Sequence, residues 1–157
     1  MEIKYFNSNF DKITQNKDTD QSITNLIEKL PSLNIVSDKN LLEETIKISN
    51  QFKEKKEKII VFGTGGSNLG ARALNNIISN NKIILEFYDN VDPINFEKNF
   101  QNINFELTGF LVISKSGTTP ETLSQFSCLY QKAIEANKVE DFFSNTLIIT
   151  EFKESPL

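Results

Sequence analysis

KIIVFGTGGSNLG, residues 58–70, has the form of a buried strand that runs directly into a glycine-rich turn. Residues 59–62, IIVF, form a short, continuously apolar and mostly β-branched run, which is typical of a parallel strand covered on both faces. The glycines that follow permit unusual backbone angles and let a ligand approach the main chain. Apolar residues then recur at helical spacing from Leu69 to Ile78, and Ser67 is predicted to cap this helix.

The same alternation continues along the rest of the chain. Three more strands are predicted, at residues 82–88, 109–113 and 146–150. A short helix opens at Asp92-Pro93, and a long helix runs from Pro120 to about Asn137. Alternating strands and helices predict a doubly wound α/β fold of the flavodoxin-like kind, a parallel sheet with helices on both faces. Ligands of such sheets bind at the carboxyl ends of the strands.

The chain before this domain has a different character. Residues 1–17 mix polar and aromatic side chains without a clear period, and we interpret them as an extended arm. Helical spacing predicts one helix over residues 18–30, stopped by Pro31, and a second over residues 39–57. The α/β domain is therefore preceded by a helical N-terminal segment.

We accordingly divide the chain into an N-terminal arm with helices, residues 1–57, and an α/β domain, residues 58–157. The last seven residues follow a buried strand and contain no closing helix. Because a sheet of this kind normally needs more cover, we expect the domain to be truncated at its C-terminal end. The chain is then an amino-terminal fragment of a longer protein.

Composition argues against several classes of function. The 157 residues carry 17 Lys and Arg against 21 Asp and Glu, and this acidic balance does not suit a nucleic-acid partner. There is no histidine and one cysteine, Cys128, so we expect no metal site and no internal disulfide. Cys128 lies in an apolar helical stretch and is expected to be buried. No stretch suggests a signal peptide or a membrane span, and we expect a cytoplasmic protein.

A second loop, SKSGTTPET at residues 114–122, carries five hydroxyl side chains within nine residues. It runs into the start of the helix predicted from Pro120, whose N-terminal N–H groups favour anions. Hydroxyls and backbone donors together can hold a phosphate monoester without a large local positive charge. Turn and capping chemistry would explain two of the hydroxyls but not readily all five. The loop therefore predicts a phosphate site.

The first loop matches neither of two nucleotide-binding motifs. A P-loop needs a lysine before its Ser or Thr, and Gly66-Ser67-Asn68 offers none. A dinucleotide fingerprint that begins at Gly63 needs glycine where Asn68 stands. ATP and NAD are therefore weak candidates, and no cofactor is expected. A tight turn that binds nothing is the alternative interpretation of this loop taken alone.

Together the two loops resemble the sugar isomerase (SIS) domain and, within it, the phosphoglucose isomerase family. The resemblance rests on Gly63–Gly70, on Ser114–Thr122 and on the weaker Asn90-Val91-Asp92-Pro93 between them. The double threonine of the second loop is the feature that indicates phosphoglucose isomerases. The similarity covers roughly residues 35–157.

The resemblance implies a cradle for the phosphate of glucose 6-phosphate or fructose 6-phosphate. The residues that would hold this phosphate are Ser67, Ser114, Lys115, Ser116, Thr119 and Thr122. Lys115 would contribute mainly its backbone N–H, and Gly66 would lie close to the sugar. The family needs no cofactor, and its members are commonly homodimers.

The resemblance also implies catalytic groups that this chain lacks. The family interconverts an aldose and a ketose through an enediolate, with a histidine, a glutamate in a Gln-x-x-Glu-His motif and an arginine after a glycine. Neither motif occurs here, so no catalytic residue is assigned and the chain alone is expected to be inactive. Glu121, the one acid inside a motif, is expected to help cap a helix.

Three hypotheses follow. The first is the phosphate-binding portion of a cytosolic isomerase of glycolysis and gluconeogenesis. The second is a sensor or regulatory module that binds sugar phosphates without catalysis. The third is a structural domain whose loops bind no ligand, and the full set of hydroxyls in residues 114–122 counts against it.

Overall fold

A computed structural model describes residues 17–78 and 82–157. The chain divides into two compact units, Met1–Lys47 and Ile48–Leu157, which are described separately. The predicted division after residue 57 stays a prediction. The arm predicted over residues 1–17 lies almost entirely outside the described residues.

The first unit consists of short helices. Its elements are α1 (Lys17–Lys29), α2 (Pro31–Asn34), the 3-10 turn η2 (Ile35–Ser37) and the start of α3 (Lys39–Phe52). Asn34 Nδ2 donates to the carbonyls of Glu28 and Leu30 at 3.0 and 3.2 Å, which satisfies the open end of α1. Asp38 accepts from the N–H of Leu41 at 3.0 Å and caps the start of α3.

Helix α3 ends at Phe52, earlier than the predicted end at residue 57. Lys55 stands just beyond it with φ 61°, the left-handed conformation that commonly terminates helices. The apolar spacing could not reveal this end, because the run of lysines and glutamates up to Lys58 is fully compatible with a helix.

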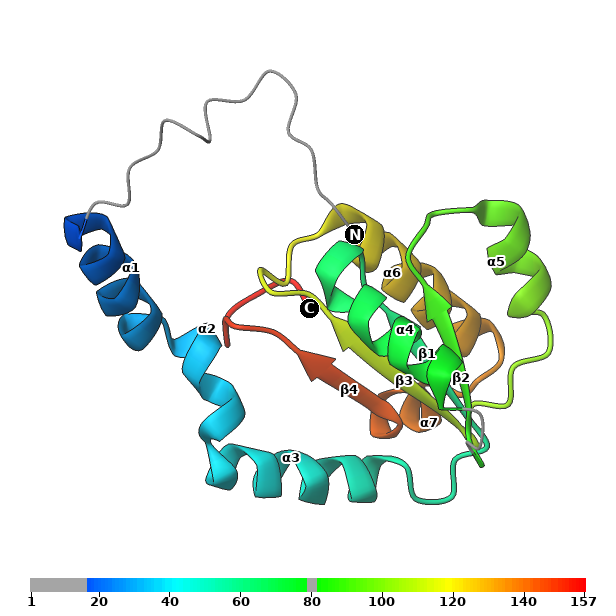
Figure 1. The fold of residues 1–157 in the computed structure, drawn as a ribbon. Coiled ribbons are helices and arrows are strands. Elements are labelled where there is room, and N and C mark those ends of the chain that lie inside the picture. Colours follow the sequence, from blue (N-terminus) through cyan, green and yellow to red (C-terminus); the bar gives the residue numbers. More distant parts are fainter. Residues whose placement is uncertain (1–16, 79–81) are drawn as a thin grey trace. The chain divides into compact units, whose positions relative to one another are not determined.

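A four-stranded parallel sheet forms the centre of the second unit (Figure 1). The strands are β1 (Lys58–Phe62), β2 (Ile84–Tyr88), β3 (Thr108–Ile113) and β4 (Thr146–Ile149), in the order β2-β1-β3-β4. Strand β1 pairs in parallel with both β2 and β3, and β3 pairs with β4. All four predicted strands are confirmed. Since they are parallel, the loops that follow them emerge at one edge of the sheet.

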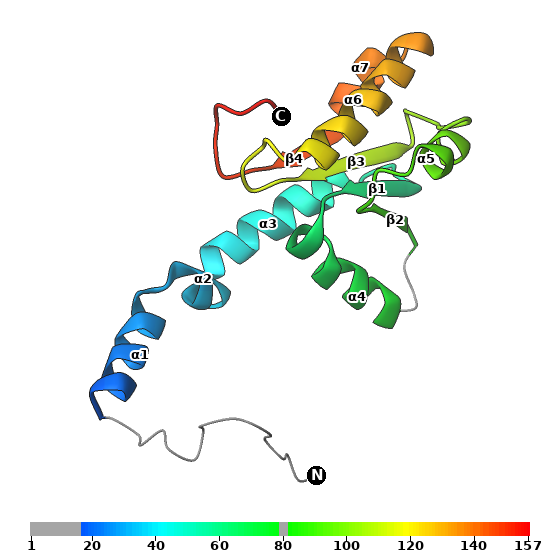
Figure 2. The ribbon, with the colours of Figure 1, turned by 90° about the horizontal axis from the view of Figure 1, so that it is seen from above.

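Helices lie on both sides of this sheet. They are α4 (Leu69–Ile77), α5 (Pro93–Asn99), α6 (Pro120–Glu135) and α7 (Val139–Ser144). Figure 2 shows α4 on one side of the sheet and α5, α6 and α7 on the other. The predicted α/β fold is therefore confirmed. The sequence did not reveal α7, because its six residues are too few for a helical period to be recognised.

Aromatic side chains fill the core between the sheet and helices α5 to α7. The fully buried rings are Phe62 and Phe110 from the strands and Phe142 from α7. The centroids of Phe62 and Phe100 are 6.2 Å apart, and those of Phe110 and Phe142 are 5.2 Å apart. Such ring pairs contribute about 0.5–1.5 kcal/mol beyond their burial. This packing fixes the end of β1, because its last residue, Phe62, is fully buried in the core.

Two local predictions were wrong. Helix α4 begins at Leu69 with Asn68 at its N-cap, so Ser67 does not cap it and lies instead in the 3-10 turn η3 (Gly65–Ser67). Cys128 is exposed rather than buried. The buried positions of α6 are Thr122, Gln125, Leu129 and Ala133, and Cys128 falls outside the stripe they form.

Candidate phosphate-binding site

The two predicted loops meet at the carboxyl edge of the sheet. They follow β1 and β3, which are paired neighbours, so about 50 residues of sequence separate side chains that lie together. An open pocket of about 660 Å³ is lined by Thr64, Ser67, Lys115, Ser116, Thr119, Glu151 and Phe152. Four of the six predicted phosphate residues are in this set. The volume suits a small ligand.

The first loop is a tight turn fixed to the sheet. The N–H of Gly63 donates to the carbonyl of Tyr88 at 3.3 Å, and the N–H of Ser67 donates to the carbonyl of Thr64 at 3.1 Å. A Cβ at Gly63 would stand 3.2 Å from the carbonyl oxygen of Ile113. Gly65 has φ +53°, which glycine adopts at little cost. These constraints place Ser67 at the pocket.

The second loop is held by its own hydroxyl groups. Ser114 Oγ lies 2.9 Å from Thr119 Oγ1 and accepts from the N–H of Gly117 at 3.1 Å. Ser116 Oγ accepts from the N–H and the hydroxyl of Thr118 at 3.2 and 2.9 Å. Thr119 is the N-cap of α6, but its side chain makes no capping bond. Its hydroxyl is therefore directed to Ser114 and the pocket rather than to the helix.

Two of the predicted phosphate residues are buried and do not line the pocket. Ser114 is only 2% exposed, and Thr122 is completely buried one turn into α6. Thr122 Oγ1 has no hydrogen-bond partner among the described residues. Gly66 is exposed and is not among the residues that line the pocket. Contact of these residues with a ligand stays a prediction.

The charged groups near the pocket form one weak pair. Lys115 Nζ lies 3.6 Å from a carboxylate oxygen of Glu151, and both side chains are more than half exposed. Exposed pairs of this kind contribute little to stability. The N–H of Glu151 also donates to the carbonyl of Lys115 at 3.0 Å, which attaches the segment after β4 to the second loop. Glu121 stands in the first turn of α6, where the helix dipole stabilises an acidic side chain.

Sequence reasoning missed three residues that line the pocket: Thr64, Glu151 and Phe152. Thr64 stands inside the first loop but had no assigned role. Glu151 and Phe152 belong to no motif. Their signal was position, because they follow β4, the strand beside β3, at the edge where ligands of parallel sheets bind.

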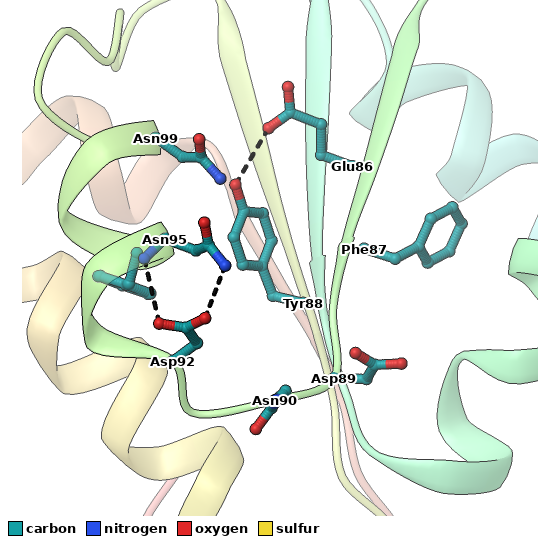
Figure 3. A pocket seen from close by; sticks show the side chains of 9 residues that line it. Glu86, Phe87, Tyr88, Asp89, Asn90, Asp92, Asn95 and Asn99 are labelled. Atoms are coloured by element: carbon teal, nitrogen blue, oxygen red, sulfur yellow. Dashed lines mark hydrogen bonds between the residues drawn. The ribbon is translucent and has the colours of Figure 1, made fainter.

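A second pocket, of about 380 Å³, lies between β2 and α5 (Figure 3). Its carboxylates already have partners. Asp92 Oδ1 accepts from the N–H groups of Ile94 and Asn95 at 3.0 and 3.2 Å, as an N-cap does. Glu86 pairs with Lys58 at 2.9 Å. Figure 3 shows Asp89 on the opposite side of β2 from Tyr88, and Asp89 bonds to Arg72 at 3.0 Å.

Tyr88 in this second pocket has a raised pKa. Burial raises its pKa above the ordinary value of 10.0, and the nearby carboxylate of Glu86 raises it further. Across the part of the chain that the structure describes, no cluster of three acidic, cysteine or histidine side chains could hold a metal. The same residues include no helix long and apolar enough to cross a membrane. Because the carboxylates of the second pocket already have partners, the pocket between the two loops is the better candidate site.

Comparison with known proteins gives a consistent family. A model of the phosphoglucose isomerase family matches residues 16–152. The chain is 34% identical over 126 residues to glucose-6-phosphate isomerase of Borreliella burgdorferi, a match that covers 76% of this chain and 23% of that protein. It is 36% identical over 95 residues to glucose-6-phosphate isomerase of Campylobacter jejuni, with coverage of 59% and 23%.

Solved structures give the same picture. The chain matches the crystal structure of a glucose-6-phosphate isomerase from Chlamydia trachomatis with TM-score 0.63 and 25% identity, over 73% of this chain and 23% of that one. A hypothetical protein from Thermus thermophilus matches with TM-score 0.63 and 27% identity, over 73% of this chain and 28% of that one. The chain thus spans about a quarter of the length of these relatives. Because the family model covers nearly the whole sequence, the chain belongs to the phosphoglucose isomerase family.

Proposed function

We propose that this chain is the sugar-phosphate-binding N-terminal portion of a glucose-6-phosphate isomerase. In this proposal its two loops hold the phosphate of glucose 6-phosphate or fructose 6-phosphate. The observation that supports it most is that Ser67, from the loop after β1, lines one pocket with Lys115, Ser116 and Thr119, from the loop after β3. The sequence predicts all four of these residues as phosphate ligands.

The chemistry of the pocket suits a phosphate ester. Hydroxyl groups and backbone N–H groups near the start of α6 can donate to the phosphate oxygens, and the positive end of the helix favours their charge. Each hydrogen bond to a charged oxygen is worth about 1.5–3 kcal/mol. The side-chain ammonium of Lys115 lies near the carboxylate of Glu151. The proposed contribution of Lys115 to the site is therefore its backbone N–H.

Isomerisation itself is proposed for the whole protein rather than for these 157 residues. The chain contains no histidine and therefore lacks the Gln-x-x-Glu-His motif that carries the family's glutamate. The groups that open the sugar ring and move the proton between the first two carbons would therefore come from outside it. We propose that the complete protein is a cytoplasmic homodimer, needs no cofactor and serves glycolysis and gluconeogenesis.

Calorimetric titration of the chain tests the binding half of this proposal. Glucose 6-phosphate, fructose 6-phosphate and inorganic phosphate should each bind, and glucose without phosphate should not. A Ser67→Ala variant should weaken all three interactions. Ser127→Ala, on the exposed surface of α6 away from the pocket, is the matched control and should leave them unchanged. Absence of binding by all three phosphates would contradict the proposal.

A further inference from the structure

Asn68 is a polar residue that the fold buries completely. Its exposed fraction is 0%, although it stands in a loop between Ser67 and Leu69, neither of which is buried. Buried amides are normally tied to partners through both their nitrogen and their oxygen. In Asn68 only the nitrogen is engaged, and Oδ1 has no partner among the described residues. The one hydrogen bond that the Asn68 side chain makes is therefore informative.

That bond closes the first loop into a ring. Asn68 Nδ2 donates to the carbonyl of Gly63 at 2.7 Å, a short distance for a neutral pair. Gly63 is itself fixed to the sheet, because its N–H donates to the carbonyl of Tyr88. It also packs closely against β3, since a Cβ at this position would stand 3.2 Å from the carbonyl oxygen of Ile113. Asn68 thus connects the far end of the loop to the rigid end of β1.

The backbone of Asn68 serves the same loop. Its N–H donates to the carbonyl of Gly65 at 3.2 Å, and its carbonyl accepts from the N–H of Arg72 at 2.9 Å, the first bond of α4. The residues enclosed between Gly63 and Asn68 include Ser67, which lines the pocket. Any change in the Asn68 side chain therefore acts on the placement of Ser67 and of the neighbouring N–H groups.

We propose that Asn68 is a positioning residue of the phosphate site, whose buried amide holds the first loop in the conformation that binds phosphate. The inference rests on the proposed function, since it concerns the same pocket. Asn68 itself would not contact the ligand, because its side chain points to Gly63 and is absent from the pocket wall. Preorganising a loop in this way raises affinity because less ordering remains to be done when the ligand binds.

The chain offers a matched control in Gln125. Its amide is also buried, with 1% exposed, and its Nε2 donates to a backbone carbonyl, that of Asn90, at 2.9 Å. Its Oε1 likewise has no partner among the described residues. The two amides differ in what they hold, because Gln125 anchors the segment after β2 and not a phosphate loop. Loss of either should cost the fold a similar hydrogen bond.

The experiment compares Asn68→Leu with Gln125→Met, which replace each amide by an apolar side chain of similar shape. Dissociation constants for inorganic phosphate and glucose 6-phosphate are measured by calorimetry, and thermal unfolding is followed by circular dichroism. Asn68→Leu should raise both dissociation constants roughly tenfold, the equivalent of one hydrogen bond. Gln125→Met should change both dissociation constants by less than about twofold. It should lower the unfolding temperature by about as much as Asn68→Leu does, because each variant loses one buried hydrogen bond.

Hydrogen exchange supplies a readout that a loss of general stability would not move selectively. The N–H of Ser67 should exchange faster in unliganded Asn68→Leu than in Gln125→Met, because only the first variant opens the loop. Asn68→Ala is measured in the same way, so that the comparison does not depend on one variant folding well.

Each outcome decides the inference. Weaker phosphate binding in the Asn68 variants alone supports it. Equal losses of phosphate affinity in the Asn68 and Gln125 variants, or unchanged affinity in the Asn68 variants, overturn it. The proposed function still stands in these cases, provided that the wild-type chain binds phosphate. Failure of the wild-type chain to bind phosphate overturns the proposed function, and the inference with it.

Discussion

Ser114 Oγ and Thr119 Oγ1 lie 2.9 Å apart across the turn of the second loop. Ser114 is buried, whereas Thr119 is half-buried and lines the pocket, so the pair links a buried residue to the pocket wall. Either oxygen can be the donor of this bond. A bound phosphate would therefore compete for, or be oriented by, the same proton.

Thr119→Val removes one hydroxyl of this pair and keeps the shape of the side chain. We expect the binding of hexose phosphates to weaken by about 1.5–3 kcal/mol, roughly a ten- to hundredfold rise in Kd, with little loss of folding. Calorimetry measures the change. Thr118→Val is the control, because Thr118 is exposed and bonds to Ser116 without lining the pocket. Unchanged affinity in Thr119→Val would remove this residue from the site.

Gly117→Ala should destabilise the domain. Gly117 has φ +65°, and a Cβ there would collide with the side chain of Ser155. Strain of this kind costs on the order of 1–3 kcal/mol. Denaturant unfolding should show this loss for Gly117→Ala and no loss for Gly70→Ala, which lies in α4, where alanine is preferred over glycine, and whose added Cβ would meet nothing within 4 Å. Equal stability of the two variants would contradict the described geometry of the second loop.

Gly66→Ala tests the predicted proximity of Gly66 to the sugar. A Cβ at this position would meet no protein atom within 4 Å, so the fold should tolerate it. If the sugar lies there, the added methyl group should weaken the binding of glucose 6-phosphate and leave inorganic phosphate unaffected. Parallel titrations with the two ligands make the comparison. Equal effects on both would place the sugar elsewhere.

Tyr88 predicts how the stability of the domain depends on pH. Its pKa is raised above 10.0 by burial and by Glu86, so the folded state keeps the phenol proton to a higher pH than the unfolded state does. Above pH 10.0 the unfolded chain then binds fewer protons, and the stabilisation is lost as pH rises through the raised pKa. The free energy of unfolding should therefore fall less steeply in Tyr88→Phe than in the wild type.

Denaturant titrations on either side of pH 10.0 measure this difference. Tyr130→Phe serves as the control, because Tyr130 is an exposed tyrosine of α6 outside the second pocket. A pH dependence in Tyr88→Phe identical to that of the wild type would show that Tyr88 is not the group responsible.

The strands could be predicted because each is a short apolar run that ends at a glycine or a polar residue. The long helix α6 was equally clear, since Pro120 opens it and Asn137, with φ 56°, stands just past its end. Local details were less accessible. Asn68 is the N-cap of α4, and its side chain bonds back to the carbonyl of Gly63 rather than to the helix, a local detail that the spacing of apolar residues does not indicate.

Part of the candidate site could also be predicted from the sequence. Residues in motifs, such as Ser67 and Thr119, were found because hydroxyls and glycines follow two strands. Their closeness followed from the rule that parallel strands present their carboxyl ends together. Glu151 and Phe152 were not found, because their place in the pocket depends on β4 lying beside β3. Likewise, the burial of Ser114 and Thr122 reflects packing and not composition.

The proposed phosphate site lies between the loops after β1 and β3. The most direct measurement is a titration of the isotope-labelled chain with glucose 6-phosphate, followed by the amide signals in NMR spectra. We expect the signals of Gly63 to Asn68 and of the non-proline residues from Ser114 to Thr122 to shift, while those around the pocket of Tyr88 and Asn95 stay in place. Shifts confined to the Tyr88 pocket, or no shifts at saturating ligand, would contradict it.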